Sequence, residues 1–467
     1  MSAIPILSGV YTSEAGDFRA SYPVNLVPLP VATGISGAYL RPADGVVSQG
    51  NGPGITRGGI NWNGICYRVM GSSLVSIDAS GNLTTIGDVG FGGQCSMDYS
   101  FDRLAIASNN NLFYWDGVTL SQVTDPDLGV VLDVVWVDGY FMTTDGEHLI
   151  VTELTDPFSV NPLKYGSSEA DPDPIVAVLK LRDEIYAVNR YTIELFNDVG
   201  GSLFPFSRNS GGQIQRGAVG THACCVFSEA IAFVGSGRNE APSVYIGQNG
   251  TTSKISTREI DLLLATYSEY HLSVSVLESK VSGNQNQLWF RLPDRTLVFD
   301  LAATSAVGEP VWFILTSAMN GFSAYRAKDL VWCYDRWLVG DGTDIGYGYL
   351  DTSTSTQWGT AYRWEFGTGI AYNSSMGAIF NRLELVALTG RIALGTDPLI
   401  TTSYSDDGET WSQDHPIHAG KQGARAKRLV WYRQGKMRNW RVQRFRGDAR
   451  AFISFARLEV QVEPLAV

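Results

Sequence analysis

A unit of short apolar strands separated by polar turns recurs along the first three-quarters of the chain. In the first copy the strands run Gly64-Ile-Cys-Tyr-Arg-Val-Met, Ser73-Leu-Val-Ser-Ile and Gly81-Asn-Leu-Thr-Thr-Ile. Seven copies can be aligned, and they start at Gly64, Asp102, Gly139, Asp183, Glu229, Gln287 and Asp329. The spacings between these starts are 38, 37, 44, 46, 58 and 42 residues, close to the length of a four-stranded propeller blade. The repeat therefore predicts a β-propeller of about seven blades.

The longest of these spacings has a local explanation. Ser256-Thr-Arg-Glu259 has the pattern of a helix capping box, and Ile260, Leu263, Leu264 and Tyr267 follow it at helical spacing. We therefore expect a short helix inserted between the fifth and sixth copies.

The composition favours an all-β protein that folds around sizeable cores. Of 467 residues, 50 are Gly, and Trp, Tyr and Phe number 12, 21 and 20, which is typical of many short strands joined by tight turns. Apolar residues make up 44% of the chain and charged residues 18%, so the composition is not that of a disordered protein. A two-sheet sandwich built from the same repeated strands is the alternative to a propeller.

The pattern changes after about residue 357. Strands become longer, as in Phe380–Leu388, and apolar residues alternate with others along Phe452–Val462. We expect three parts: an N-terminal extended segment (1–60), a β-propeller (61–356) and a basic C-terminal β-sandwich (357–467).

The charge is unevenly divided between these parts. The chain has a formal net charge of -12, but Gly420–Arg457 contains twelve Lys and Arg against one acid, Asp448. This segment therefore carries +11, and the remaining chain carries -12 - 11 = -23. The overall acidity excludes a protein coated in positive charge, but it does not exclude a basic contact surface.

Within this segment, basic residues alternate with aromatic ones in a predicted basic hairpin, 425–446. Arg outnumbers Lys, which favours a protein interface, because arginine suits desolvated, bidentate pairs. Two alternatives stay open: a solvated strand face with its aromatics in the core, and a surface that binds DNA phosphates and stacks on bases. The candidates for a protein-interface or DNA-facing role are Arg425, Lys427, Arg428, Arg433, Lys436, Arg438, Arg441, Arg444 and Arg446.

Motifs for catalysis or for cofactor binding are missing from the sequence. There is no Walker A loop, no G-x-G-x-x-G turn, no G-x-S-x-G elbow and no H-E-x-x-H. His222-Ala-Cys224-Cys225 offers at most two ligands on one strand face, so we interpret these as ordinary buried residues, and His415 and His418 as residues of a solvated loop. We expect no cofactor, no metal site and no enzymatic activity.

One short motif favours a different class of protein. Tyr404-Ser-Asp406-Asp407-Gly408-Glu-Thr410-Trp411 resembles the Asp-box turn of sialidases and related propellers, with Tyr404 where that motif normally has Ser or Thr. It occurs once, outside the repeat. The alternative function is therefore a glycan hydrolase or lectin built on an Asp-box-type propeller.

Cysteine usage and the N-terminus indicate where the protein is assembled. The five cysteines, Cys66, Cys95, Cys224, Cys225 and Cys333, are odd in number and form no C-x-x-C pair, which fits a reducing cytoplasm. No basic residue precedes Arg19 and no run of 18 apolar residues occurs, so we expect neither a secretory signal nor a membrane-spanning segment.

Short matches spread in order over most of the chain resemble the tail hub family of short-tailed bacteriophages (podoviruses), also called tail accessory factors or packaged-DNA stabilisation proteins. Each match is weak, and their order along the chain makes the resemblance specific. They are Tyr22-Pro-Val-Asn-Leu26, Gly37-Ala-Tyr-Leu40, Arg57-Gly58, Tyr67-Arg-Val-Met-Gly71, Ile193-Glu-Leu-Phe196, Ala241-Pro-Ser-Val-Tyr-Ile-Gly247, Leu297-Val-Phe-Asp300, Ser405-Asp-Asp-Gly408, and Arg428, Trp431, Gly435 and Arg438.

The resemblance implies a non-enzymatic virion protein of the phage tail, assembled in the host bacterial cytoplasm. It implies a ring of six copies that binds the portal adaptor, closes the channel after packaging, stabilises the packaged DNA and supports tail spikes or fibres and the tail needle. Contact with DNA in the channel stays open, and the family's motifs carry no catalytic residue to this chain.

Overall fold

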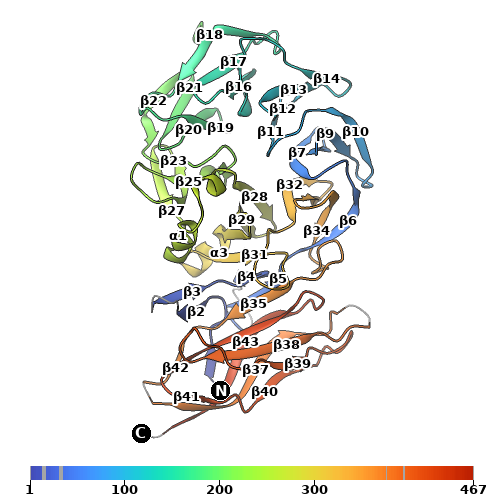
Figure 1. Cartoon of the computed structure of the whole chain (residues 1–467), viewed down its shortest axis with the longest axis vertical. Helices are drawn as coiled ribbons and strands as arrows, with labels where there is room; N and C mark the ends of the chain where they lie inside the picture. The colour runs from blue at the N-terminus through green and yellow to red at the C-terminus, as the bar shows by residue number, and fades with distance from the viewer. Residues whose placement is uncertain (1, 13–16, 31–34, 375, 393–394, 466–467) are drawn as a thin grey trace.

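The computed structural model of the chain describes residues 2–12, 17–30, 35–374, 376–392 and 395–465. They form a ring of small β-sheets with a second β-domain attached at one end of the long axis (Figure 1). The first and last described strands, β1 and β43, both belong to this second domain. The prediction of an all-β chain with a propeller and a sandwich is therefore confirmed.

The ring consists of seven antiparallel sheets, which we call blades 1 to 7, and the predicted number of blades is thus confirmed. Four strands form each sheet except in blade 5, where β23 and β24 both pair with β25. The strands, given blade by blade, are β7 (Thr56–Trp62), β8 (Ile65–Met70), β9 (Ser73–Ile77) and β10 (Leu83–Asp88); β11 (Ser96–Tyr99), β12 (Leu104–Ser108), β13 (Asn111–Trp115) and β14 (Leu120–Gln122); β15 (Asp133–Val137), β16 (Tyr140–Thr144), β17 (His148–Thr152) and β18 (Val160–Ser167); β19 (Ile175–Leu181), β20 (Glu184–Asn189), β21 (Ile193–Asp198) and β22 (Phe206–Ile214); β23 (Gly217–Ala218), β24 (Cys224–Phe227), β25 (Ala230–Ser236), β26 (Ser243–Gln248) and β27 (Thr251–Lys254); β28 (Val276–Ser282), β29 (Gln285–Arg291), β30 (Thr296–Asp300) and β31 (Trp312–Leu315); β32 (Ala327–Cys333), β33 (Arg336–Asp341), β34 (Gly346–Asp351) and β6 (Gly45–Asn51).

The last repeat copy was predicted one strand out of phase. The first six copies coincide with the second strand of blades 1 to 6, whereas the copy at Asp329 falls in β32, the first strand of blade 7. The second strand of that blade is β33, which begins at Arg336. Both strands are apolar and both follow an Asp, so the local pattern did not separate them.

Blade 7 closes the ring by combining the two ends of the propeller sequence. Its outer strand is β6, which pairs with β34 from Gly346↔Asn51 to Asp351↔Gly45. Blade 1 is joined to blade 7 by the buried Arg68 of β8, which donates to the carbonyl of Leu338 in β33 at 2.9 Å. Since β6 comes from the start of the propeller sequence and β32, β33 and β34 come from its end, blade 7 holds the two ends of the ring in one sheet.

Carboxylates tie the inner strands of neighbouring blades to one another; Asp133 is buried, and Asp98 and Glu278 are partly buried. Asp98 of blade 2 accepts from the amide of Trp136 in blade 3 at 2.6 Å, and Asp133 of blade 3 accepts from the amide of Val178 in blade 4 at 2.9 Å. Glu278 of blade 6 accepts from the amide of Leu330 in blade 7 at 2.8 Å. Each carboxylate thus links its blade to the next, and without Asp133 the amide of Val178 would lie buried with no acceptor.

Among the described residues, three short helices interrupt the strands. The predicted insertion is confirmed as α1 (Arg258–Leu264), followed by α2 (Glu269–Ser273). The capping box predicted for α1 was wrong, because Thr257 and not Ser256 is the N-cap. Ser256 donates to Asp261, and Glu259 accepts from an amide in β3. The third helix, α3 (Leu301–Val307), was not predicted. None of the helices in the described residues has the length and hydropathy needed to cross a membrane.

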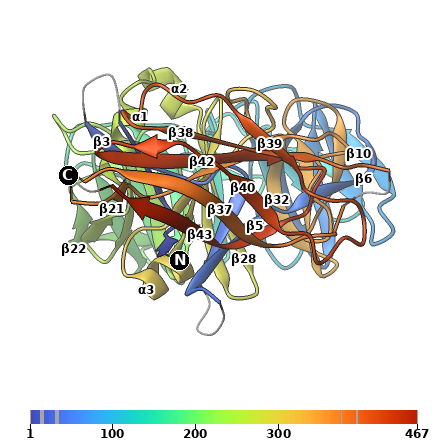
Figure 2. The same cartoon turned by 90° about the horizontal axis from the view of Figure 1, so that it is seen from below.

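The second domain is a β-sandwich of two sheets that meet over an aromatic core. Trp364, Phe366, Trp431, Phe445 and Phe455 lie in this core. One sheet contains β4 (Leu26–Pro30), β5 (Ala38–Pro42), β43 (Ser454–Pro464), β37 (Ala378–Leu388) and β40 (Leu429–Tyr432), with β1 (Ser2–Ile4) and β41 (Lys436–Met437) at its margins. The other contains β35 (Arg363–Gly367), β42 (Trp440–Asp448), β38 (Leu399–Ser405) and β39 (His415–His418), with β36 (Ala371–Tyr372) beside β42. Figure 2 shows these strands from the end opposite the propeller.

The structure divides the first 60 residues between the two domains, whereas the sequence led us to expect one extended segment. The strands β1, β4 and β5 belong to the sandwich, and β6 and the start of β7 belong to the propeller. This arrangement follows from ring closure, because β6 brings the residues before it next to the residues that leave blade 7.

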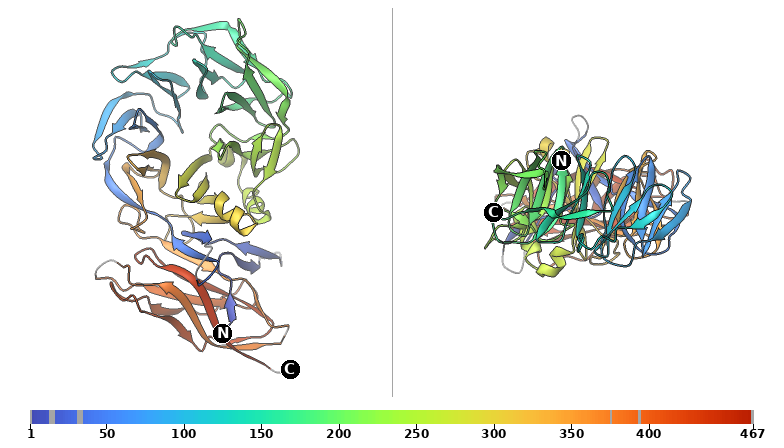
Figure 3. Two further views of the ribbon diagram at one scale, coloured as in Figure 1. Left: turned by 180° about the vertical axis from the view of Figure 1, so that it is seen from behind. Right: turned by 90° about the horizontal axis from the view of Figure 1, so that it is seen from above.

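A small hairpin of β2 (Gly9–Thr12) and β3 (Phe18–Ser21) lies between the two domains, as the blue strands in the left view of Figure 3 show. It pairs with the propeller through Asp17 and Arg258. It contacts the sandwich through the ring of Phe18, whose centroid lies 5.6 Å from that of Trp440. The hairpin therefore contacts both domains.

The tie formed by Asp133 gives the propeller a predictable pH dependence. Burial raises the pKa of the Asp133 carboxyl to about 6. The folded state therefore holds this proton more tightly than the unfolded chain, and the carboxyl costs stability as the pH rises through 4 to 6. We expect the melting temperature of Asp133→Asn, taken relative to wild type, to be a few degrees higher at pH 8 than at pH 4.5, which corresponds to about 2–3 kcal/mol.

Thermal melts of both chains at the two pH values measure this difference. Asp133→Ala is the control: it leaves the amides of Val134 and Val178 without an acceptor and should lower the melting temperature at both pH values. A difference between Asp133→Asn and wild type that does not change with pH would contradict the assignment.

Candidate interface in the C-terminal sandwich

The basic segment 425–446 does not form the predicted hairpin. Its first strand, β40, pairs with β37 in one sheet, whereas β42 pairs with β35 and β38 in the other. The segment thus crosses from one sheet of the sandwich to the other. As a result its basic side chains fall into two groups, one built into the fold and one exposed.

Arg441 belongs to the first group, because it is only 1% exposed. Its guanidinium donates to Oε1 of Gln443 at 2.8 Å and to the carbonyl of Gln434 at 2.6 Å. It also lies over the rings of Phe380 and Tyr404, at 4.3 and 3.8 Å from their centroids. Burial lowers the pKa of this guanidinium to about 10, so it remains charged at neutral pH. A side chain held in this way supports the sandwich and cannot reach a partner.

Arg444, Arg446 and Arg428 are also engaged within the domain. Arg444 stacks over the Trp411 ring at 3.9 Å, and Arg446 forms an ion pair with Asp414 at 2.6 Å. Arg428 donates from both Nε and Nη2 to the Glu384 carboxylate, at 2.6 and 2.5 Å. These hydrogen bonds from Arg428 are the main cause that lowers the pKa of Glu384. Arg428 stays exposed on its outer side, whereas the other two are partly buried.

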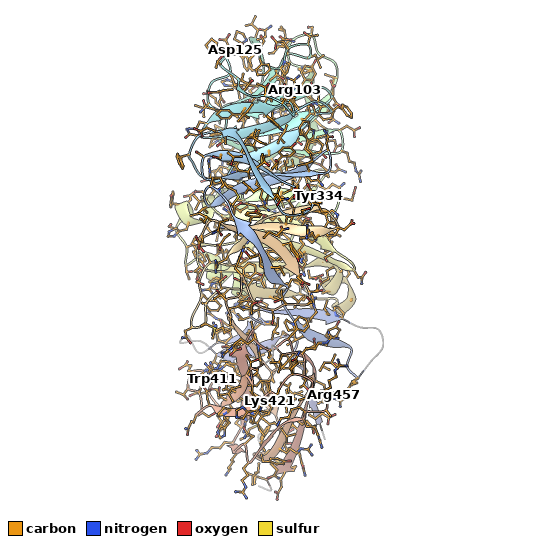
Figure 4. The ribbon with its side chains drawn as sticks, turned by 90° about the vertical axis from the view of Figure 1, so that its right-hand side faces the viewer. Arg103, Asp125, Tyr334, Trp411, Lys421 and Arg457 are labelled. Carbon is orange, nitrogen blue, oxygen red and sulfur yellow. The ribbon has the colours of Figure 1, made fainter. Side chains whose placement is uncertain are left out.

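The remaining five candidates form an exposed group that we call the basic strip: Arg425, Lys427, Arg433, Lys436 and Arg438. They flank β40 and β41, and within the part of the chain that the structure describes none of them forms an ion pair. Tyr432, at the end of β40, is 66% exposed between them. Lys421 adds a further charge at the same end of the molecule (Figure 4). The strip combines unpaired positive charge with an exposed aromatic ring, which is typical of a binding surface.

The Asp-box-like turn lies in the sandwich, between β38 and β39. Asp407 accepts from the amides of Glu409 and Thr410 at 2.9 and 2.8 Å, and Gly408 has a φ of 79°. A hydrogen bond from the Thr410 hydroxyl, followed by these amides, lowers the pKa of the Asp407 carboxyl. The carboxylate is thus used to hold the turn, and Trp411 is covered by Arg444.

The structure agrees only in part with the positions that the sequence predicted for the His and Cys residues. Cys224 is buried in β24, but His222 lies in the turn before that strand and is only partly buried. His415 and His418 lie in β39 and not in a loop. All five cysteines are free thiols, and the described residues contain no group of three or more His, Cys, Asp or Glu side chains arranged to hold a metal ion.

Two family models match the chain, one for each domain. The model described as bacteriophage P22 Gp10, beta-propeller, matches residues 2–355, and the model described as bacteriophage P22 Gp10, beta-sandwich, matches residues 363–463. The chain is 26% identical over 459 residues to the tail hub protein gp10 of Salmonella phage P22, which covers 93% of this chain and 94% of that protein.

Solved structures are similar at a much lower level. The Pan2 WD40 domain of Neurospora crassa is 9% identical with a TM-score of 0.43, covering 66% of this chain and 94% of that domain. Kluyveromyces lactis Hsv2 is 8% identical with a TM-score of 0.37, covering 68% of this chain and 94% of that protein. We draw no argument from similarities this weak.

The division of the basic residues into two groups predicts different effects of substitution. Arg441→Ala removes a buried charge, leaves the carbonyl of Gln434 and Oε1 of Gln443 without their donor, and should cost about 2–4 kcal/mol in free energy of unfolding. Arg438→Ala removes an exposed side chain and should change stability by less than about 0.5 kcal/mol. Chemical denaturation of the two variants measures this. Equal losses would contradict the division.

Proposed function

The chain belongs to the bacteriophage P22 Gp10 family, and on that premise we propose that it is the tail hub of a short-tailed bacteriophage. In this role it is a non-enzymatic structural protein of the virion that closes the portal channel after packaging, stabilises the packaged DNA and supports the tail spikes and needle. The observation that carries the proposal is the relation to the P22 tail hub protein over 93% of this chain, across both domains and in the same order.

The partners under this proposal are those of a hub. The protein forms a ring of six copies, binds the portal adaptor on one side, and carries spikes or fibres and a needle, after assembly in the host bacterial cytoplasm. A closed propeller suits a protein that binds several partners, because its strand edges are short. Its blades are also tied together by hydrogen bonds from amides of one blade to carboxylates of the next. The hairpin of β2 and β3 contacts both domains.

Within the hub, the basic strip serves a protein interface. Its five charges surround an exposed tyrosine, and aromatic and basic side chains together are enriched where proteins meet. The body outside the segment 420–457 carries -23, which offers the strip an acidic protein surface and repels the phosphates of DNA.

The proposal is tested by assembly on DNA-filled heads that carry the portal and its adaptor. We expect the chain to bind these particles at a copy number fixed by the symmetry of the portal ring and to reduce DNA loss from them. Native mass measurement of the assembled complex gives the copy number, and nuclease digestion gives the retained DNA. Heads without the adaptor are the control. A copy number unrelated to the portal ring would refute the hub role.

A second expectation separates this role from that of a glycan hydrolase. Because Asp407 is committed to its own turn and its neighbour Trp411 is covered, we expect incubation with host surface polysaccharide to release no new reducing ends. A reducing-end assay with a phage glycan hydrolase as positive control measures this. Release above the background would favour the enzyme.

A further inference from the structure

One face of blades 2 to 4 carries exposed apolar side chains. In each blade the turn between the first and second strands and the turn between the third and fourth strands emerge on the same face, because the strands are antiparallel. On this face Phe101 is 89%, Val118 86% and Leu154 56% exposed, and Val199 and Leu203 of blade 4 are exposed as well. Single exposed apolar residues are ordinary, but five on adjoining turns make a patch of the kind that binds another protein.

The turns that hold this patch belong to packed, neighbouring blades and are not isolated loops. The ring of Phe101 in blade 2 contacts that of Trp136 in blade 3, with centroids 5.4 Å apart. Phe158, from the outer turn of blade 3, lies 5.2 Å from the ring of Tyr114 in blade 2. These ring contacts hold the turns of blades 2 and 3 against each other.

Acidic residues surround the patch. The same turns and their immediate edges hold seven acids, Asp102, Asp116, Asp138, Glu153, Asp156, Asp183 and Asp198, and two arginines, Arg103 and Arg182. Asp102 and Glu153 are already paired, with Arg103 and with Lys164 of β18, and Arg182 pairs with Glu229 of blade 5. Five of the seven acids therefore have no ion-pair partner among the described residues. A partner that covers the patch must therefore bring positive charge and avoid phosphate.

The basic strip meets both requirements, and it lies on the opposite end of the same molecule. Figure 4 shows this separation: Arg103 lies toward the propeller end and Lys421 in the sandwich. The strip offers unpaired Lys and Arg around the exposed Tyr432, which is the complement of exposed apolar residues inside an acidic rim. We propose that the patch on blades 2 to 4 binds the basic strip of a second copy of this chain.

This contact is head-to-tail, because each copy uses two different surfaces. A head-to-tail contact repeats around a rotation axis and closes a ring, which is the assembly that a hub requires. The inference therefore rests on the proposed function and names the surfaces through which its copies meet.

Two variants, one that makes the patch more positive and one that makes the strip negative, test the contact separately and then together. The patch variant, Val118→Lys with Asp183→Lys, places positive charge opposite a positive strip. The strip variant, Lys427→Glu with Lys436→Glu, places negative charge opposite a negative patch. All four side chains are exposed and none forms an ion pair among the described residues, so both variants should keep the stability of wild type.

We expect wild type to self-associate in sedimentation velocity at low salt and to dissociate as salt is added. Each variant alone should lose about tenfold or more in association constant. An equimolar mixture of the two should recover association, because the reversed patch of one copy then faces the reversed strip of the other. Recovery in the mixture is specific to this pairing of surfaces.

The matched control is Glu147→Lys with Glu169→Lys, which reverses two exposed acids on the opposite face of blades 3 and 4. It should associate like wild type. A wild type that stays monomeric at every salt concentration, variants that associate normally, or a mixture that shows no recovery would each overturn the contact. Binding of duplex DNA by the strip, lost in the strip variant, would overturn it in favour of nucleic acid.

These outcomes are separable from the failure of the hub proposal. If wild type joins DNA-filled heads at the portal's symmetry while the mixture shows no recovery, the hub stands and this contact falls. If wild type self-associates as described but does not join heads, the contact stands and the hub falls.

Discussion

Closure of the ring by β6 is the constraint on which the rest of the structure depends. The pairing of β6 with β34 completes blade 7, and it brings the residues before β6 beside the residues that leave the propeller. The sandwich is then built from both ends of the chain, with β4 and β5 joined to the sheet of β43 and β37. Carboxylates at the ring centre and Arg68 between the first and last blades hold the closed form. One pairing thus sets the propeller, the sandwich and their attachment.

The charge is also divided between the two domains, because the positive segment lies in the sandwich. A net charge of -12 combines a segment at +11 with a remainder at -23, and the structure divides the basic side chains of the positive segment into an engaged group and an exposed group. Arg441 and Arg444 fill the sandwich with guanidinium–ring contacts, and Arg428 and Arg446 pair with acids of the same domain. What remains, five unpaired side chains around Tyr432, is a smaller and better-defined surface than the sequence indicated.

The sequence predicted features set by residues close together in the chain, and it missed pairings between strands that are far apart in the chain. Seven blades followed from apolar runs between Asn- and Gly-containing turns, such as the turn at Gly117, whose φ is 95°. The same pattern could not assign β6 to blade 7 or β40 and β42 to different sheets, because those pairings join residues far apart in the chain. For the same reason the sequence showed the basic segment 425–446 as a cluster of charge but did not predict the burial of Arg441. The apolar patch on blades 2 to 4 and its acidic rim were not predicted, because only the closed ring places those turns on one face.

The central claim is that a closed propeller and a basic sandwich together make one subunit of a ring in a phage tail. An image of the assembled particle by electron cryomicroscopy tests it most directly. We predict a ring of this chain below the portal and its adaptor, in which every subunit shows both domains and each propeller faces the sandwich of its neighbour. Particles in which the chain lies elsewhere, or forms no ring on the portal axis, would contradict the account.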